Sequence, residues 1–112
     1  MSVITDIRKE YTLLGLRRRD LHPDAISQFQ IWFQQAADAD VAEPSAMTLA
    51  TADKDGRPSA RMVLLKSVDE RGFSFYTNHE SRKGRELAEN PRAALVFYWA
   101  ELERQVCVSG DV

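Results

Sequence analysis

A short basic segment, Ser81-Arg82-Lys83, is the part of this 112-residue sequence whose residue types and spacing best suit binding chemistry. The pattern predicts that a helix begins at Ser81, with Arg82 and Lys83 in its first turn. Cations in a first turn oppose the helix dipole. They are favoured if an anion binds at the same helix end, where backbone N–H groups, a hydroxyl and two positive side chains gather. The segment therefore predicts a phosphate site, and the alternative interpretation is a solvated basic turn.

Two apolar runs of strand length precede this predicted helix. They occupy residues 61–66 and 73–77, and the turn-rich segment 69–72 joins them. The second run would bring Tyr76 and Thr77 to its C-terminal end, beside the predicted phosphate site.

Alternation along the first run separates its two basic residues. One face would carry Arg61, Val63 and Leu65, and the other Met62, Leu64 and Lys66. Arg61 and Lys66 can therefore contact one ligand only if the strand bulges or if the ligand wraps around its end.

An amphipathic helix is predicted from Ala25 to Ala39, either with Asp24 as its cap or with Pro23 in its first turn. Its apolar residues recur at spacings of three and four, as in Ile26, Phe29, Trp32, Phe33 and Ala36. An aromatic stripe at helical spacing is typical of a face that packs on a protein core. A second, shorter helix is predicted from Thr5 to Leu14.

Strands are predicted at residues 46–51 and 58–66, with an Asp-Gly hairpin turn at 53–56 between them. The near-continuous apolar run 92–99 predicts a buried strand, and a further strand begins at Arg104. At least five consecutive strands with one inserted helix favour an antiparallel barrel. We expect a single domain over residues 1–112, mainly β with flanking helices. It would comprise an arm at 1–23, the amphipathic helix at 24–39, and barrel strands at 46–112.

Composition restricts the class of protein. The sequence is 44% hydrophobic and 29% charged, with a net charge of −2 and a pI near 5.7. These values argue against a disordered chain, a membrane protein or a broad nucleic-acid-binding surface. The single cysteine can form no internal disulfide, and no signal peptide is visible, so we expect a soluble cytoplasmic protein.

Other kinds of site find little support in the sequence. One cysteine and two separated histidines do not make a usual zinc set, and no Gly-rich nucleotide loop is present. No catalytic nucleophile can be assigned. The basic run Arg17-Arg18-Arg19 is interpreted as a solvated surface, with an anion-binding arm as the alternative. An anion site beside aromatic and basic strand ends suits flavin mononucleotide (FMN) or a phosphorylated small molecule.

The sequence resembles the pyridoxamine 5′-phosphate oxidase family, whose members use FMN to make pyridoxal 5′-phosphate. Seven segments in order carry the resemblance: Arg8-Lys-Glu-Tyr11, Gly15-Leu-Arg-Arg-Arg-Asp-Leu21, the run from Arg61 to Lys66, Phe75-Tyr-Thr-Asn78, Ser81-Arg-Lys83, Asn90-Pro-Arg92 and Leu102-Glu-Arg-Gln-Val106. The resemblance implies an FMN-binding split β-barrel, incomplete in this chain, that forms a homodimer with FMN at the subunit interface.

The resemblance also implies roles for individual residues. The implied flavin contacts are Arg61, Met62, Val63, Leu64, Leu65, Lys66, Tyr76 and Thr77, with Arg82 and Lys83 clamping the FMN phosphate and Gln105 reaching across from the partner subunit. The implied substrate contacts are Arg8, Lys9, Glu10 and Tyr11, in a segment that closes over the substrate, together with Lys66. Lys9 stands where an arginine is usual.

The implied reaction oxidises pyridoxamine or pyridoxine 5′-phosphate, with oxygen as the final acceptor. A hydride leaves the C4′ carbon for the flavin, and the protein aims that carbon and holds two phosphates. Family members continue well past Val112, so the sequence is expected to be an N-terminal half. We expect a dimer or larger assembly that binds FMN weakly and has little or no oxidase activity alone. The alternatives are a non-catalytic flavin or phosphate-binding module, and another split-barrel flavin reductase.

Overall fold

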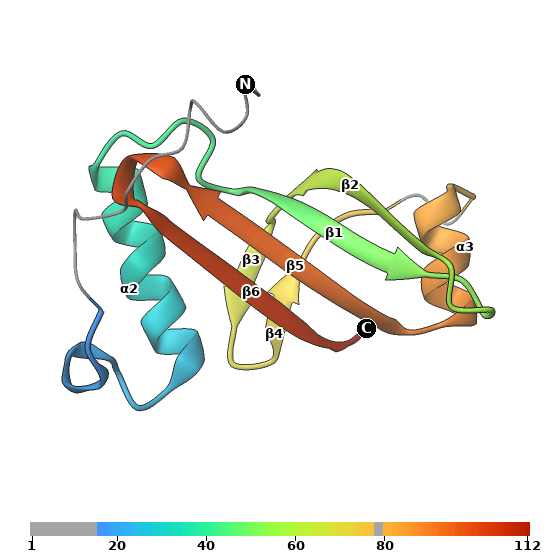
Figure 1. The fold of residues 1–112 in the computed structure, drawn as a ribbon, viewed down its shortest axis with the longest axis horizontal. Helices are drawn as coiled ribbons and strands as arrows, with labels where there is room; N and C mark the ends of the chain where they lie inside the picture. The colour runs from blue at the N-terminus through green and yellow to red at the C-terminus, as the bar shows by residue number, and fades with distance from the viewer. Residues whose placement is uncertain (1–15, 78–79) are drawn as a thin grey trace, which may run out of the picture.

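The computed structural model describes residues 16–77 and 80–112, which form two helices, two short 3-10 turns and six strands. In chain order (Figure 1) they are η1 Arg18–Asp20, α2 Ala25–Asp38, β1 Ala46–Ala52, β2 Pro58–Leu64, β3 Ser67–Asp69, β4 Gly72–Ser74, α3 Arg82–Glu89, β5 Arg92–Trp99, η2 Ala100–Leu102 and β6 Arg104–Asp111. Neither helix is long and apolar enough to cross a membrane.

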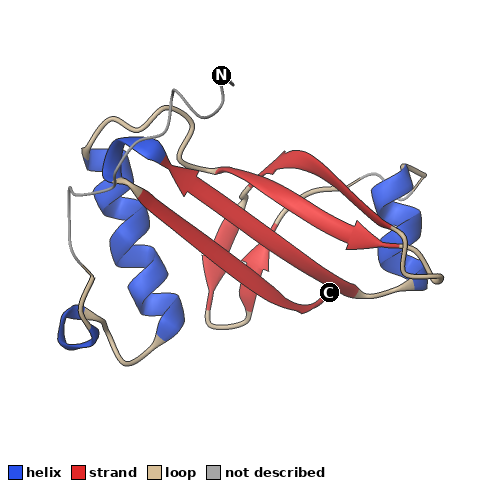
Figure 2. Cartoon of the chain, viewed as in Figure 1, coloured by secondary structure: helices blue, strands red, loops and turns tan. Residues whose placement is uncertain are grey.

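Four strands form an antiparallel sheet in the order β2-β1-β5-β6, and β3 pairs with β4 in a separate hairpin (Figure 2). In the described part of the chain β2 and β6 are the edges of the larger sheet, so the sheet does not close. The expectation of a mainly β, antiparallel and incomplete barrel with flanking helices is confirmed. The boundaries proposed for the arm and the barrel portion stay a prediction.

Both helices within the described residues begin where their capping residues predict. The Asp24 carboxylate accepts a hydrogen bond of 3.0 Å from the backbone N–H of Ser27 at the start of α2. The Ser81 hydroxyl accepts one of 3.2 Å from the N–H of Gly84 at the start of α3. These bonds satisfy donors that have no partner within the helix. The predicted helix at residues 5–14 lies outside the described residues.

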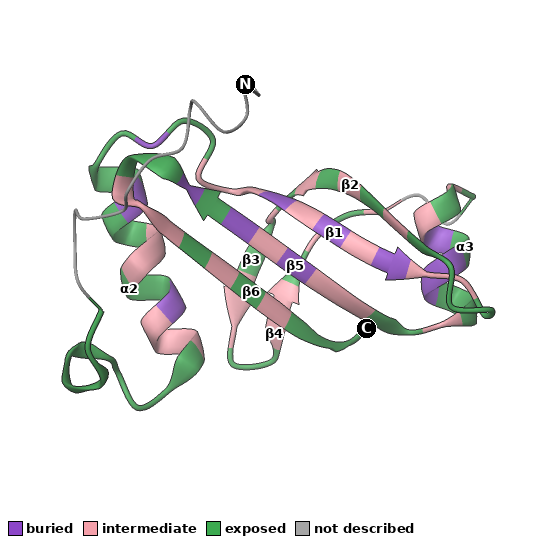
Figure 3. Cartoon of the chain, viewed as in Figure 1, coloured by how far each residue is buried: buried purple, intermediate pink, exposed green. Residues whose placement is uncertain are grey.

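The core lies on one face of the four-stranded sheet. Alternate residues of β1 and β5 are buried there (Figure 3). The aromatic stripe of α2 packs against them. Phe29 of α2 lies 4.9 Å from Phe97 and 4.8 Å from Phe73, measured between ring centroids, and so joins the sheet to the small hairpin. The Trp99 indole N–H donates to the carbonyl of Pro44 at 3.0 Å, which satisfies its polar atom inside the core.

The other face of the sheet is open. The side chains of Met62, Leu64 and Tyr98 are 63%, 59% and 56% exposed. The prediction that residues 92–99 form a strand is therefore confirmed, but the expectation of full burial is wrong. Residues of β5 alternate, because only one face of the sheet is covered within the described part of this chain.

The predicted strands at 58–66 and 73–77 are partly wrong. The first ends at Leu64, and it pairs with β1, with Arg61 opposite Leu49. The Leu65 N–H still donates to the Ser45 carbonyl at 2.8 Å, one residue beyond the β1–β2 register. At Lys66 the chain turns to the small hairpin, where its N–H donates to the Ser74 carbonyl at 2.7 Å. The second predicted strand shrinks to β4, because its partner is the three-residue β3 and not the longer run 61–66.

Candidate anion-binding site

The start of α3 places a cation where the sequence predicts one, and a carboxylate of the same helix holds it. The Arg82 Nε donates to Glu86 Oε1 at 2.9 Å, one turn along the same helix, while the Arg82 side chain remains 68% exposed. Lys83, the next residue, is half-buried. The helix start therefore holds two cations, of which Arg82 is oriented by an internal carboxylate.

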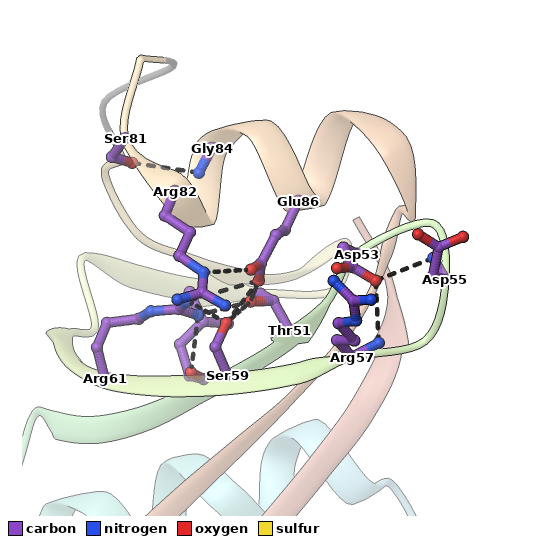
Figure 4. Close-up of polar contacts among 11 residues, drawn as sticks. Thr51, Asp53, Asp55, Arg57, Ser59, Arg61, Ser81, Arg82, Gly84 and Glu86 are labelled. Carbon is purple, nitrogen blue, oxygen red and sulfur yellow. Dashed lines mark hydrogen bonds and ion pairs between the residues drawn. The ribbon is translucent and has the colours of Figure 1, made fainter.

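Glu86 lies at the centre of a polar cluster between α3 and the β1–β2 hairpin (Figure 4). It is 5% exposed, and it accepts hydrogen bonds from the hydroxyl of Thr51 and, at 2.7 Å, from that of Ser59. Arg61 enters the same cluster from β2, with its Nη2 3.6 Å from Glu86 Oε2. A charged group is buried at tolerable cost only when it is paired in this way.

Arg61 is also held by its own strand and its neighbour. Its Nη1 donates to the Leu49 carbonyl at 3.2 Å and to the Thr51 hydroxyl at 2.7 Å, and its Nη2 donates to the Ser59 hydroxyl at 2.8 Å. The predicted strand face is confirmed, since Arg61, Val63 and Leu65 share the half-buried side. Arg61 therefore lies under α3, close to Arg82, and not on the open face of the sheet.

The hydrogen bonds set the charge of this cluster. Hydroxyl donation by Thr51 and Ser59, followed by the contribution of Arg82, lowers the pKa of Glu86 from 4.5 to about 2. The carboxylate is therefore ionised at neutral pH. One negative and two positive side chains leave a positive excess, and Lys83 adds to it, so the start of α3 can attract an anion.

Glu86, Thr51 and Ser59 were not among the residues proposed from the sequence. A signal for them existed. The predicted Asp-Gly turn fixes the hairpin register that puts Thr51 opposite Ser59, and Glu86 follows Arg82 by four residues, the spacing of a helical ion pair.

A second group of predicted residues gathers where the chain approaches α3. The Lys66 amino group lies 5.6 Å from the centroid of the Tyr76 ring, and that ring is 77% exposed. The Thr77 hydroxyl is buried without a hydrogen-bond partner among the described residues. A buried polar atom without a partner costs free energy, so Thr77 is available to a ligand's polar group.

The remaining predicted residues lie elsewhere. Val63 and Leu65 pack against the core, whereas Met62 and Leu64 project from the open face. Gln105 lies on that open face too, opposite Tyr98 in the β5–β6 register. The proposed substrate residues Arg8, Lys9, Glu10 and Tyr11 lie outside the described residues.

Among the described residues, these positions are suited to hold a ligand's phosphate at the start of α3, but they do not form a complete site for a whole ligand in one chain. Arg61, Arg82 and Lys83 supply cations there, and Thr77 supplies an unused hydroxyl. Gln105, which the resemblance assigns to a partner subunit's flavin, lies on the open face, and so do Met62 and Leu64, which it assigns to the flavin of this chain. Within residues 16–77 and 80–112, no three His, Cys, Asp or Glu side chains converge as a metal ion would need.

An apolar cavity of about 670 Å³ lies elsewhere, between the start of α2, the β3–β4 hairpin and β6. None of the residues proposed from the sequence lines it. The cavity is therefore separate from the candidate site.

The known sequences that match this chain point to one family. Residues 33–112 match the family described as Pyridoxamine 5′-phosphate oxidase. A protein from Paraburkholderia phymatum named Pyridoxine/pyridoxamine 5′-phosphate oxidase is 61% identical over 112 residues, which are 100% of this chain and 53% of that protein. A protein of the same name from Nostoc sp. PCC 7120 is 62% identical over 109 residues, 97% of this chain and 51% of that protein. The chain thus spans about half the length of the curated relatives it matches.

Solved structures agree on the fold. PhzG from Burkholderia lata 383, in complex with tetrahydrophenazine-1-carboxylic acid, superposes with a TM-score of 0.82 at 40% identity, over 87% of this chain and 49% of that one. A pyridoxamine 5′-phosphate oxidase-related, FMN binding protein from Nostoc punctiforme gives a TM-score of 0.66 at 22% identity, over 82% of this chain and 47% of that one. The second likeness supports the fold alone.

Proposed function

The chain belongs to the pyridoxamine 5′-phosphate oxidase family, and from this premise we propose that it binds FMN and serves the oxidation of pyridoxamine or pyridoxine 5′-phosphate to pyridoxal 5′-phosphate, with oxygen as acceptor. The observation that carries the proposal is the convergence of Arg61 and Arg82 at the start of α3, where Lys83 follows. That position is suited to the terminal phosphate of FMN.

The other residues have roles that follow from where they lie. Lys66, Tyr76 and Thr77 would contact the flavin where the chain approaches α3, with Lys66 shared between the flavin and the substrate. Met62 and Leu64 would face the flavin from the open side of β2, whereas Val63 and Leu65, which pack toward the core, could contact it only through their backbone. Gln105 would contact the flavin of a partner subunit, which makes the working form a homodimer. FMN, when bound, supplies the hydride acceptor.

The chain's own residues would bind and orient the substrate. Arg8, Lys9, Glu10 and Tyr11 would close over it, and Lys66 would hold it near the flavin. The amine substrate would lose a hydride from C4′, and water would hydrolyse the resulting imine. No side chain is assigned as a nucleophile or proton donor. A cytoplasmic location stays a prediction.

A chimera tests this function. Residues 1–112 replace the matching half of the Paraburkholderia phymatum relative, and hydrogen peroxide and pyridoxal 5′-phosphate are measured with FMN and each substrate. We expect both products in equal amounts, and we expect loss of FMN binding when Arg82 and Lys83 are replaced by alanine. A folded chimera that binds FMN but turns over neither substrate would contradict the proposal, because it would leave the chain as a non-catalytic binding module.

A second candidate rests on the match to PhzG, whose bound ligand carries a carboxylate and no phosphate. An enzyme with that preference would act on a fused-ring carboxylic acid. The separate alternative, a split-barrel flavin reductase, would use a nicotinamide cofactor. Offering the chimera these compounds beside the two vitamin B6 phosphates separates the possibilities. The higher identity to the oxidases, 61% against 40%, favours the phosphorylated substrates.

A further inference from the structure

Glu86 is a buried carboxylate for which the proposed flavin site has no direct use. The Glu86 carboxylate would not contact the phosphate of a ligand directly, because two negative charges repel each other. It nevertheless makes hydrogen bonds or ion contacts with four side chains, from β1, β2 and its own helix. An ionised group with so many partners, beside a proposed phosphate site, calls for a function other than direct binding.

We infer that Glu86 is a positioning residue, which holds the guanidinium groups of Arg61 and Arg82 in the arrangement that receives the phosphate of FMN. The inference rests on the proposed function and assigns a specific role within it. Arg61 comes from β2 and Arg82 from α3, and the Glu86 carboxylate is the group that both approach, at 3.6 and 2.9 Å (Figure 4).

The carboxylate is itself fixed, as a positioning group must be. The Ser59 hydroxyl donates to Glu86 Oε2 at 2.7 Å, and the Thr51 hydroxyl donates to the same oxygen. The other oxygen, Oε1, accepts from Arg82. One oxygen is thus anchored to the hairpin and the other orients the arginine.

The two arginines depend on Glu86 unequally. Arg61 would keep its bonds to the Leu49 carbonyl and to the two hydroxyls if the carboxylate were removed. Arg82, which is 68% exposed, has its one described side-chain bond to Glu86. Without the carboxylate, repulsion from Arg61 and the entropy of a long side chain both favour release of Arg82 into solvent. The effect of Glu86 on phosphate binding should therefore act through Arg82.

Two other roles for Glu86 predict different behaviour. A carboxylate that merely docks α3 on the hairpin would affect every ligand at the site equally. A carboxylate that competes with the phosphate for the arginines would, when removed, strengthen FMN binding. Riboflavin, which is FMN without its phosphate, distinguishes these roles from positioning.

The test measures dissociation constants for FMN and riboflavin by fluorescence titration of the 112-residue chain. The variants are Glu86→Ala, Glu86→Gln, Arg82→Ala, and Arg82→Ala combined with each of the two Glu86 changes. The control is Glu89→Gln, at an exposed position of the same helix. The measured quantity is the preference for FMN over riboflavin. We expect Glu86→Ala to lower this preference about tenfold, the size of one charge-assisted hydrogen bond. Glu86→Gln, which keeps an acceptor oxygen, should lower it less.

Riboflavin affinity should stay at the wild-type value, and neither Glu86 change should lower the preference further once Arg82 is alanine. If Glu86→Ala does not fold by circular dichroism, Glu86→Gln carries the test. An unchanged or increased preference, an equal loss for both flavins, or additive losses with Arg82→Ala would overturn the inference while leaving the proposed function intact. Failure of the wild-type chain to bind either flavin would instead refute the proposed function, and the inference with it.

Discussion

At the scale of single residues, Glu86 links the packing of α3 to the proposed phosphate site. The same carboxylate joins α3 to the β1–β2 hairpin and orients a cation at the helix start. Its ionisation is therefore expected to affect folding as well as the flavin site. These two effects can be separated by pH and by ligand.

Stability should depend on pH through Glu86. Its pKa is lowered from 4.5 to about 2 in the folded chain, so its stabilisation is fully present above pH 4.5 and is lost as the pH falls through 2. The wild-type chain should unfold at a higher temperature than Glu86→Gln at pH 6, and the difference should shrink between pH 4.5 and 2. Thermal unfolding followed by circular dichroism checks this. If the difference in unfolding temperature stayed constant down to pH 2, the charge of the Glu86 carboxylate would not be the source of the stabilisation of the folded chain.

The cations at the start of α3 should discriminate between flavins. Replacing Arg82 and Lys83 with alanine should weaken FMN binding at least tenfold, since each charge-assisted contact contributes about 1.5–3 kcal/mol. Riboflavin binding should change little. The control is Arg85→Ala, because Arg85 lies on the same helix and donates to the Glu80 carbonyl. Equal losses from the control and the double variant would mean that general positive charge, and not the helix start, attracts the phosphate.

At the scale of elements, local signals predicted some boundaries well and failed at others. Both described helices begin at their capping residues, Asp24 and Ser81, because a cap is a local hydrogen bond. The strand expected at 73–77 ends at Ser74, because its length depends on a partner strand and not on its own residues. Which face of a strand is covered depends likewise on distant elements, so the open face of β5 could not be predicted locally.

The candidate site shows the same division. Arg82 and Lys83 were predicted because their place in the first turn is a local feature of the sequence. Thr51 and Glu86 are 35 residues apart, and no periodicity links them. Their contact depends on how α3 lies across the hairpin, a tertiary arrangement that no single segment specifies.

Packing of α2 should depend on Phe29 more than on any exposed neighbour. Phe29 is 4% exposed, and its ring contacts those of Phe33, Phe73, Phe97 and Trp99. Phe29→Ala should lower the free energy of unfolding by about 3–5 kcal/mol, through lost burial and the cavity left behind. Ile31→Ala on the same helix, where the side chain is 44% exposed, should cost much less. Urea unfolding measures both, and similar costs would mean that α2 does not pack as described.

At the scale of the whole molecule, the open face of the sheet is the feature that one chain leaves unexplained. Met62, Leu64 and Tyr98 form exposed apolar surface across β2 and β5, and Gln105 lies on the same face. Exposed apolar surface of this kind commonly marks an interface. The proposed flavin contacts lie on both faces of one sheet, which agrees with the proposal that a second subunit completes the site.

Self-association should therefore involve the open face. We expect the wild-type chain to sediment as a dimer or larger, and Tyr98→Asp to shift it toward monomer by placing a charge in the interface. Ile31→Asp, an exposed apolar position on α2, serves as the matched control and should leave the assembly unchanged. Sedimentation velocity measures all three. A monomeric wild-type chain would remove the role proposed for Gln105.

The most direct test of the central claim, that this chain binds FMN by its phosphate, compares FMN with riboflavin on the unmodified 112-residue chain. Fluorescence titration gives both dissociation constants under identical conditions, and repeating it at higher salt exposes the ionic contribution. We expect FMN to bind at least about tenfold more tightly than riboflavin, as one or more charge-assisted phosphate contacts require, and we expect salt to reduce the difference. Equal affinity for the two flavins, or no binding of either, would contradict it.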